Sequence, residues 1–165
     1  MIKERVLKAL NDQINREFYA SYLYLAMAAH FDLQSLDGFA RWMFKQSEEE
    51  YGHAMRILNH VLERGGKVEL QPIAAPPAEF GSPLDIFRQA LEHERKVTGY
   101  INEIYKLAVE EEDYAAQSLM EWFVNEQVEE EDTVGRIVDR LELAGDNRAA
   151  ILMLDAELGQ RTETD

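Results

Sequence analysis

Four glutamates occupy positions that the sequence otherwise gives to apolar side chains. Each stands in a line of residues seven apart, a spacing that keeps side chains on one face of a helix. The lines are Leu10, Glu17, Tyr24, Phe31; Met43, Glu50, Ile57; Phe87, Glu94, Ile101; and Phe123, Glu130, Ile137. If four helices align end to end, the four carboxylates lie at one level inside a bundle.

Carboxylates placed in this way need a compensating charge. A buried, unpaired carboxylate costs several kcal/mol as an ion, or else it stays protonated. Pairing with Lys or Arg, or exposure to solvent, would explain one such residue, but no Lys or Arg shares the four lines. A divalent or trivalent cation would remove the repulsion among all four. The pattern therefore predicts a metal site in the middle of the bundle.

One histidine strengthens this prediction. Glu50-Tyr51-Gly52-His53 has the Glu-x-x-His spacing, which places both side chains on the same helix face. Carboxylate and imidazole together suit iron, although the motif alone arises easily by chance. We interpret the other histidines as structural or solvent-exposed; they are His30, His60 and His93. The predicted helix that carries Glu130 has Gln127-x-x-Glu130 rather than a second Glu-x-x-His, which predicts one metal position poorer in ligands.

Composition narrows the functional classes. The 165 residues include 32 acidic and 17 basic side chains, for a net charge of −15, which argues against a nucleic-acid partner. The chain has no cysteine, so disulfides, thiolate zinc sites and iron–sulfur clusters are excluded. The longest apolar run, 22–29, is too short to span a bilayer. With no targeting segment visible, we expect a cytoplasmic protein without a membrane partner.

Hydrophobic periodicity predicts one domain over residues 1–165 with helices at about 2–31, 37–64, 83–112, 114–144 and 147–158. Asp37 and Asp113 are the expected N-caps of the second and fourth helices, and Pro83 begins the third. The connection 65–82 is long, whereas the neighbouring links are short. A long connection lets the second and third helices run parallel. The expected fold is all-α: an up-down-down-up four-helix bundle with a long crossover and a short fifth helix.

Three stretches carry a resemblance to a known family. They are Asn11–Glu17, Glu48–Ala54 and Trp122–Glu131, with sequences NDQINRE, EEEYGHA and WFVNEQVEEE. With them the chain resembles the prokaryotic non-haem ferritins, of the ferritin-like di-iron superfamily, over nearly its full length. The resemblance implies a self-assembled cage of 24 subunits that stores ferric oxide. It also implies iron storage and detoxification by a ferroxidase, which oxidises Fe²⁺ with O₂ or peroxide.

The resemblance also implies roles for individual residues. It assigns one iron to Glu17, Glu50 and His53, and a second iron to Glu50, Glu94 and Glu130, with Gln127 nearby, giving two irons per subunit. Glu50 would bridge the two ions. Tyr24 and Trp122 match aromatic residues beside this centre, where Tyr24 would hydrogen-bond a ligand or donate an electron; core packing is the alternative for both. Residues matching a third iron site are Glu49, Glu126 and Glu129, which are equally well interpreted as a solvated acidic face.

The sequence argues against haem binding but leaves two other functions open. Haem-binding relatives carry a second Glu-x-x-His motif and a Met after the bridging Glu; this chain has Tyr51 there, so no haem is expected. A di-iron carboxylate oxidase or peroxidase of the same fold, without a storage role, is the main alternative. A non-catalytic mineral shell is the other alternative, and it would be expected to lack the ligands that this chain keeps.

Overall fold

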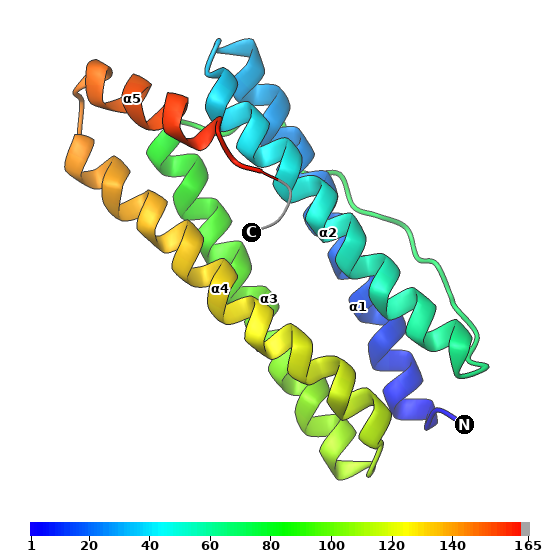
Figure 1. Cartoon of the computed structure of the whole chain (residues 1–165). Helices are drawn as coiled ribbons and strands as arrows, with labels where there is room; N and C mark the ends of the chain where they lie inside the picture. Colours follow the sequence, from blue (N-terminus) through cyan, green and yellow to red (C-terminus); the bar gives the residue numbers. More distant parts are fainter. Residues whose placement is uncertain (163–165) are drawn as a thin grey trace.

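The computed structural model describes residues 1–162, and within them it contains five α-helices and no strand. The helices are α1 (Glu4–Leu33), α2 (Asp37–Glu63), α3 (Pro83–Glu110), α4 (Tyr114–Ala144) and α5 (Arg148–Leu158) (Figure 1). Their order is the predicted one, and their ends lie within two residues of the predicted ends. The all-α bundle with a short fifth helix is confirmed.

Local side chains begin three of the helices. The Asp113 carboxylate accepts a hydrogen bond from a backbone amide in the first turn of α4, as predicted, and Asn147 does the same for α5. At α3, Ser82 and Asp85 form a reciprocal capping box on either side of Pro83. These caps pair backbone N–H groups that have no partner within the helix.

The predicted N-cap of α2 is wrong. Leu36 precedes the helix without a side-chain cap, and Asp37 is its first helical residue. The start of α2 is instead paired from far along the chain, because Asp155 of α5 accepts a hydrogen bond from the backbone N–H of Phe39 at 2.8 Å. A tertiary contact thus replaces the local cap that the sequence suggested.

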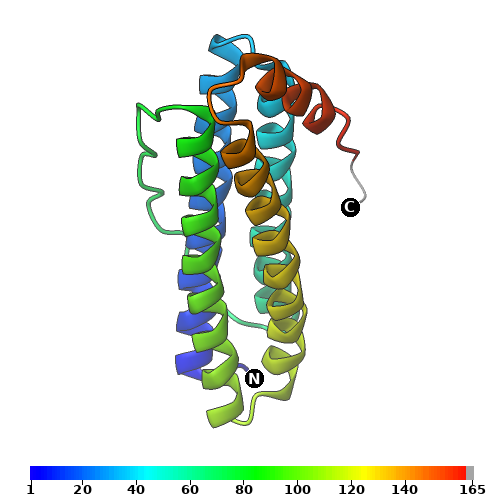
Figure 2. The same ribbon diagram turned by 90° about the vertical axis from the view of Figure 1, so that its left-hand side faces the viewer.

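Two helix pairs make the bundle. α1 packs against α2 and α3 packs against α4, each pair joined by a short link. The connection 65–82 runs along the length of the bundle, so α2 and α3 are parallel (Figures 1 and 2). Asn11 of α1 holds the first part of this connection: its amide nitrogen donates to the carbonyl of Lys67 at 3.0 Å, and its oxygen accepts from the N–H of Glu69 at 2.8 Å.

The apolar core is divided in two. One cluster contains Phe31, Phe39 and Phe87, and the other contains Leu10, Ile57 and Phe123. Between the clusters lies a layer of four buried acidic side chains, here termed the carboxylate layer: Glu17, Glu50, Glu94 and Glu130. The bundle therefore surrounds a polar level near the middle of every long helix.

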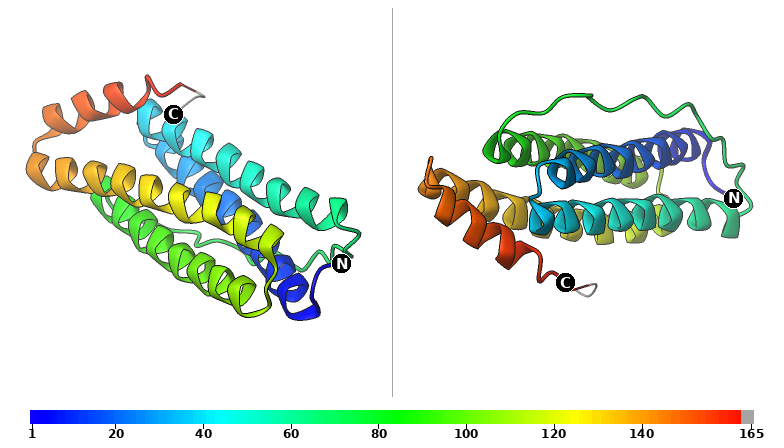
Figure 3. Two further views of the ribbon diagram at one scale, coloured as in Figure 1. Left: turned by 60° about the horizontal axis from the view of Figure 1, so that its bottom comes forward. Right: turned by 90° about the horizontal axis from the view of Figure 1, so that it is seen from above.

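The fifth helix leaves the bundle axis at its end and packs against α2, so that the described chain end returns beside α2 (Figures 1 and 3). Among residues 1–162, no helix has a stretch long and apolar enough to cross a membrane.

Candidate metal centre

Each long helix contributes one member of the carboxylate layer. Glu17 comes from α1, Glu50 from α2, Glu94 from α3 and Glu130 from α4, and their exposed fractions are 1%, 2%, 1% and 6%. The apolar residues one helical turn or more on either side bury these positions, so the acids are held at one depth. The structure thus brings together the four glutamates singled out by their periodicity.

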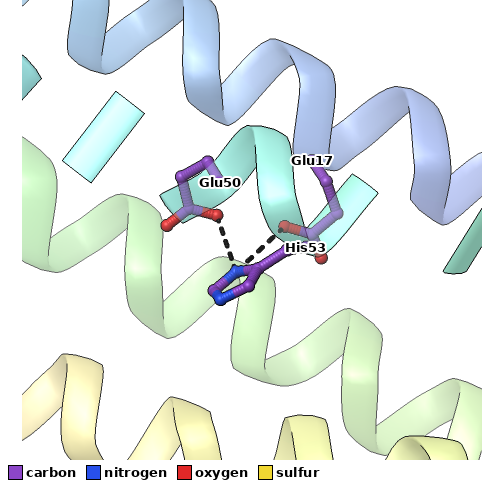
Figure 4. A group of neighbouring side chains, drawn as sticks. All are labelled: Glu17, Glu50 and His53. Carbon is purple, nitrogen blue, oxygen red and sulfur yellow. Dashed lines mark hydrogen bonds and ion pairs between the residues drawn. The ribbon is translucent and has the colours of Figure 1, made fainter. Parts of the chain in front are cut away.

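One group of ligand atoms lies within the α1–α2 pair. Glu17, Glu50 and His53 each offer an atom, and these atoms lie within 4.8 Å of one another. His53 Nδ1 is 3.2 Å from Glu50 Oε2 and 4.0 Å from Glu17 Oε2 (Figure 4). Glu17 Oε2 is buried and has no hydrogen-bond partner among residues 1–162. Because an unpaired buried oxygen is costly, this atom marks a place for a cation.

A second group shares Glu50 with the first. Glu50, Glu94 and Glu130 place one oxygen each within 4.8 Å of one another, and all three side chains are buried. The first group holds the imidazole and the second holds only carboxylates. Two neighbouring metal positions with a common carboxylate therefore fit this geometry, and Glu50 is the residue that can bridge them.

The third predicted cluster is arranged differently. His53, Glu126 and Glu130 form a group within 4.8 Å, but among residues 1–162 no such group includes Glu49 or Glu129. Glu49 Oε2 instead lies 2.7 Å from the Arg161 guanidinium. One pocket of about 220 Å³ is lined by all three predicted residues, Glu49, Glu126 and Glu129, and it also reaches Glu130. A third iron held jointly by Glu49, Glu126 and Glu129 stays a prediction.

Gln127 faces the second group, with its amide nitrogen as the contacting atom. Its Nε2 donates to Glu94 Oε2 at 3.1 Å, to the Glu94 carbonyl at 3.2 Å and to Thr98 Oγ1 at 3.2 Å. An amide nitrogen that donates has no lone pair for a metal ion. In this arrangement Gln127 orients Glu94, and ligation through its oxygen stays a prediction.

Two aromatic residues border the centre. The Tyr24 hydroxyl donates a hydrogen bond to Glu94 Oε1, so Tyr24 directly contacts a candidate ligand in addition to packing in the core. Trp122 makes an edge contact with the His53 ring, with centroids 5.5 Å apart, and the Arg56 guanidinium lies 3.9 Å from its ring centroid. Trp122 therefore limits how the imidazole can turn.

Sequence reasoning missed two buried amides that hold candidate ligands. Gln13 Nε2 donates to Glu17 Oε1 at 2.7 Å, and Gln46 Nε2 donates to Glu50 Oε1 at 3.1 Å and to Glu130 Oε2 at 2.8 Å. Both amides are fully buried. The available signal was spacing, since each glutamine stands four residues before a ligand glutamate on the same helix face.

Burial and mutual repulsion make these carboxyl groups hard to ionise without a metal. Desolvation raises the pKa of Glu17 and of Glu50 well above the ordinary value, and the neighbouring carboxylates raise it further. The pKa of Glu130 is raised for the same two reasons. Burial also raises the pKa of Glu94, while the hydrogen bond from Tyr24 opposes the rise. A bound cation would reverse this balance and release protons.

Comparison with known proteins agrees with this geometry. The family model of the ferritin-like domain matches residues 7–144. A bacterial non-heme ferritin of Bacteroides fragilis strain 638R is 42% identical over 161 residues, which cover 98% of this chain and 100% of the relative. A bacterial non-heme ferritin of Staphylococcus aureus strain USA300 is 38% identical over 162 residues, covering 98% of each chain.

Solved structures give the same answer. The open pore ferritin from the hyperthermophilic archaeon Archaeoglobus fulgidus matches with a TM-score of 0.97 and 46% identity, covering 98% of this chain and 100% of that one. A humanized archaeal ferritin matches with a TM-score of 0.97 and 46% identity, covering 98% and 99%. The family model spans most of the chain and these relatives span nearly all of it; the chain belongs to the ferritin family.

Proposed function

We propose that this protein stores and detoxifies iron, and that it is a ferroxidase whose substrate, Fe²⁺, is oxidised at the carboxylate layer. The observation that carries this proposal is the shared Glu50, which belongs to two groups of potential ligand atoms at once. A site for a pair of ions suits a reaction in which two ions each lose an electron. The names of the relatives, non-heme ferritins, support the same activity.

The ligands suggest how oxidation is favoured. Carboxylate oxygens prefer the harder and more highly charged Fe³⁺ to Fe²⁺, so a carboxylate-rich site stabilises the product. Two Fe²⁺ supply two electrons, and O₂ with two protons accepts them to give hydrogen peroxide and two Fe³⁺. Binding of Fe²⁺ would displace protons from the buried carboxyl groups. These protons would be released beside the oxidant, where its reduction consumes protons.

Delivery of the substrate follows from charge. The net charge of −15 attracts cations, and the pocket that reaches Glu130 is lined by further acidic side chains. Two irons per subunit is the stoichiometry that the two ligand groups would hold. A cytoplasmic location and the absence of a nucleic-acid or membrane partner stay predictions.

We also propose that the subunits assemble into a cage of about 24 copies, since ferritin family members are its relatives in sequence and structure. Large apolar side chains exposed on the single subunit support self-association, among them Leu33, Leu143 and Met153. Light scattering of the purified protein tests the copy number directly. A monomeric mass would contradict the cage.

The activity is tested by adding aerobic Fe²⁺ to the wild type and to a Glu50→Ala, His53→Ala double variant. We expect the initial oxidation rate of the variant to fall to the background rate of Fe²⁺ in buffer, with assembly size unchanged by light scattering. The matched control is Glu103→Ala, an exposed glutamate on α3, which should oxidise iron like the wild type. Equal rates for the wild type and an intact double variant would contradict the site.

Storage is separated from a di-iron oxidase or peroxidase by the amount of iron retained. A storage protein should keep far more iron per assembly than the pair at each centre, whereas an oxidase should saturate at that pair. Iron content after loading and gel filtration distinguishes the two functions. A non-catalytic shell would retain mineral without accelerating oxidation.

A further inference from the structure

Arg161 connects the chain end after α5 to the middle of α2. Its guanidinium lies over the Trp42 ring, 4.6 Å from the centroid, and Nη1 donates to the Trp42 carbonyl at 3.2 Å. The same Nη1 donates to Gln46 Oε1 at 3.0 Å, and Nη2 donates to Glu49 Oε2 at 2.7 Å. The side chain is only 13% exposed. Three residues on one face of α2 thus hold one guanidinium.

The position of Arg161 is set by a close helix crossing. A Cβ atom added to Gly38 would lie 1.7 Å from the carbonyl oxygen of Asp155, so α5 passes directly over the first turn of α2. Gly159 meets the same place, since its added Cβ would lie 3.0 Å from Gly38 Cα. The hydrogen bond from Phe39 N–H to Asp155 fixes the crossing further. The chain therefore leaves α5 alongside α2 (Figures 1 and 3), where Arg161 reaches Gln46 and Glu49.

Gln46 lies between Arg161 and two potential metal ligands. A guanidinium has donors and no acceptor, so the Gln46 atom that faces Arg161 must be its oxygen. The Gln46 nitrogen is then directed inward, where it donates to Glu50 Oε1 at 3.1 Å and to Glu130 Oε2 at 2.8 Å. Without the guanidinium, the buried Gln46 oxygen loses the partner that anchors it, and the amide is held only through the two carboxylates that it should position.

We propose that Arg161 is a positioning residue of the metal centre, acting through Gln46, whose orientation it fixes so that Glu50 and Glu130 are held in place for the second metal position. Residues that orient ligands typically change metal affinity by about 10- to 100-fold when they are removed. The helix α5 thereby has a role in the chemistry of a site to which it supplies no ligand. This inference rests on the proposed function only in that the carboxylate layer binds metal.

The test uses Co²⁺ as the probe, because its absorption bands report the geometry of its ligands. Iron-free wild-type assembly is titrated with Co²⁺ beside Arg161→Ala, Gln46→Ala and the double variant. We expect Arg161→Ala to weaken one class of Co²⁺ sites by about tenfold or more and to change the absorption bands. We expect Gln46→Ala to do the same, and the double variant to show no larger effect than either single one.

Arg140→Ala is the matched control. Arg140 joins α4 to α5 by two hydrogen bonds to Glu157, at 2.8 and 2.6 Å, and among residues 1–162 it makes no hydrogen bond or ion pair with Arg161 or Gln46. Removal of the Arg140 side chain loosens α5 but leaves the hydrogen bonds from Arg161 to Gln46 and from Gln46 to the carboxylates in place. The Co²⁺ affinity and absorption bands should therefore equal those of the wild type. A change in this control as large as that of Arg161→Ala would assign the effect to loosening of α5 and overturn the proposal.

Three further results would count against it. Wild-type affinity and absorption bands in Arg161→Ala would overturn the positioning role while leaving the metal centre intact. Effects of Arg161→Ala and Gln46→Ala that add in full would show that Arg161 does not act through Gln46. Failure of the wild type itself to bind Co²⁺ would instead overturn the proposed metal centre, and the positioning role with it.

Discussion

Replacing Glu50 by glutamine should stabilise the metal-free protein at alkaline pH. Glu50 shares the buried layer with Glu17, Glu94 and Glu130, and the glutamine keeps its size and one acceptor oxygen while removing its charge. Two unit charges 4.8 Å apart repel by about 3.5 kcal/mol at an effective dielectric constant of about 20. At pH 8 the wild type either bears this repulsion or takes up protons to avoid it. Removal of the charge should therefore raise the free energy of unfolding at pH 8 by about 2–4 kcal/mol, or the Tm by about 6–12 °C.

The effect should depend on pH in a definite direction. The pKa of Glu17, of Glu50 and of Glu130 is raised by burial and by the neighbouring carboxylates, so the folded state binds protons that the unfolded state releases. The stability that these carboxyl groups contribute is therefore fully present below their ordinary pKa of about 4.5, and this contribution is lost as the pH rises through the raised pKa values. At pH 5 the gain from Glu50→Gln should shrink to less than about 1 kcal/mol, because protonation has already relieved the repulsion in the wild type.

The assay is thermal and urea unfolding of chelator-treated protein at pH 8 and pH 5, followed by circular dichroism. Glu103→Gln makes the same chemical change at an exposed position and should leave stability unchanged at both values of pH. Added Co²⁺ at a hundred times its Kd should stabilise the wild type by about 2.7 kcal/mol and the variant by less. An equal gain at both values of pH, or a loss at pH 8, would refute charge repulsion as the cause.

Three further predictions concern the scaffold. Gly38→Ala should detach α5 and lower the Tm, with a loss of about 1–3 kcal/mol in the free energy of unfolding, because the added Cβ would meet a backbone carbonyl of α5. Gly52→Ala lies inside α2 with open space around it, and in the same thermal scan it should gain about 0.5–1 kcal/mol in the free energy of unfolding. Burial and a nearby lysine lower the pKa of His93 to about 4, so the stability that the neutral imidazole gives above pH 6.5 is lost as the pH falls. In urea unfolding, His93→Phe should lessen this loss by about 2 kcal/mol at pH 5 and should change the stability little at pH 8. Burial raises the pKa of Asp113, but hydrogen bonds from Arg64 and from the backbone outweigh burial, so the net pKa is lowered. Asp113→Asn should destabilise the protein at pH 7, and the difference in unfolding free energy from the wild type should disappear as acid titrates the native carboxylate. A difference in unfolding free energy that does not depend on pH would contradict the ion pair.

Periodicity was enough to predict the fold and the gathering of four buried carboxylates. A helix face repeats every few residues, so an acid at Glu17 or Glu94 in an apolar line stands out within its own segment. Once four helices are required to bury those lines, their acids must meet. The bundle, the crossover and the carboxylate layer are therefore largely consequences of local pattern and connection length.

What the sequence could not predict depends on contacts between distant segments. The start of α2 is paired by Asp155 rather than by Asp37, because α5 crosses there, and no local pattern encodes the direction of that crossing. Arg161 reaches Gln46 for the same reason, across 115 positions of sequence. The amide of Gln46 was accessible through its spacing to Glu50, but only the packed structure shows that it also contacts Glu130.

The division of the ligands between the two helix pairs has a consequence for the order of events during synthesis. Glu17, Glu50 and His53 all belong to the first pair, so an unfinished chain that has folded only α1 and α2 contains the complete first group. The second group needs α3 and α4. A nascent hairpin can thus offer a place for a single ion, whereas the two-ion arrangement exists only when the whole chain has been made and both halves have docked. The two-electron oxidation that we propose is in this way limited to the finished subunit.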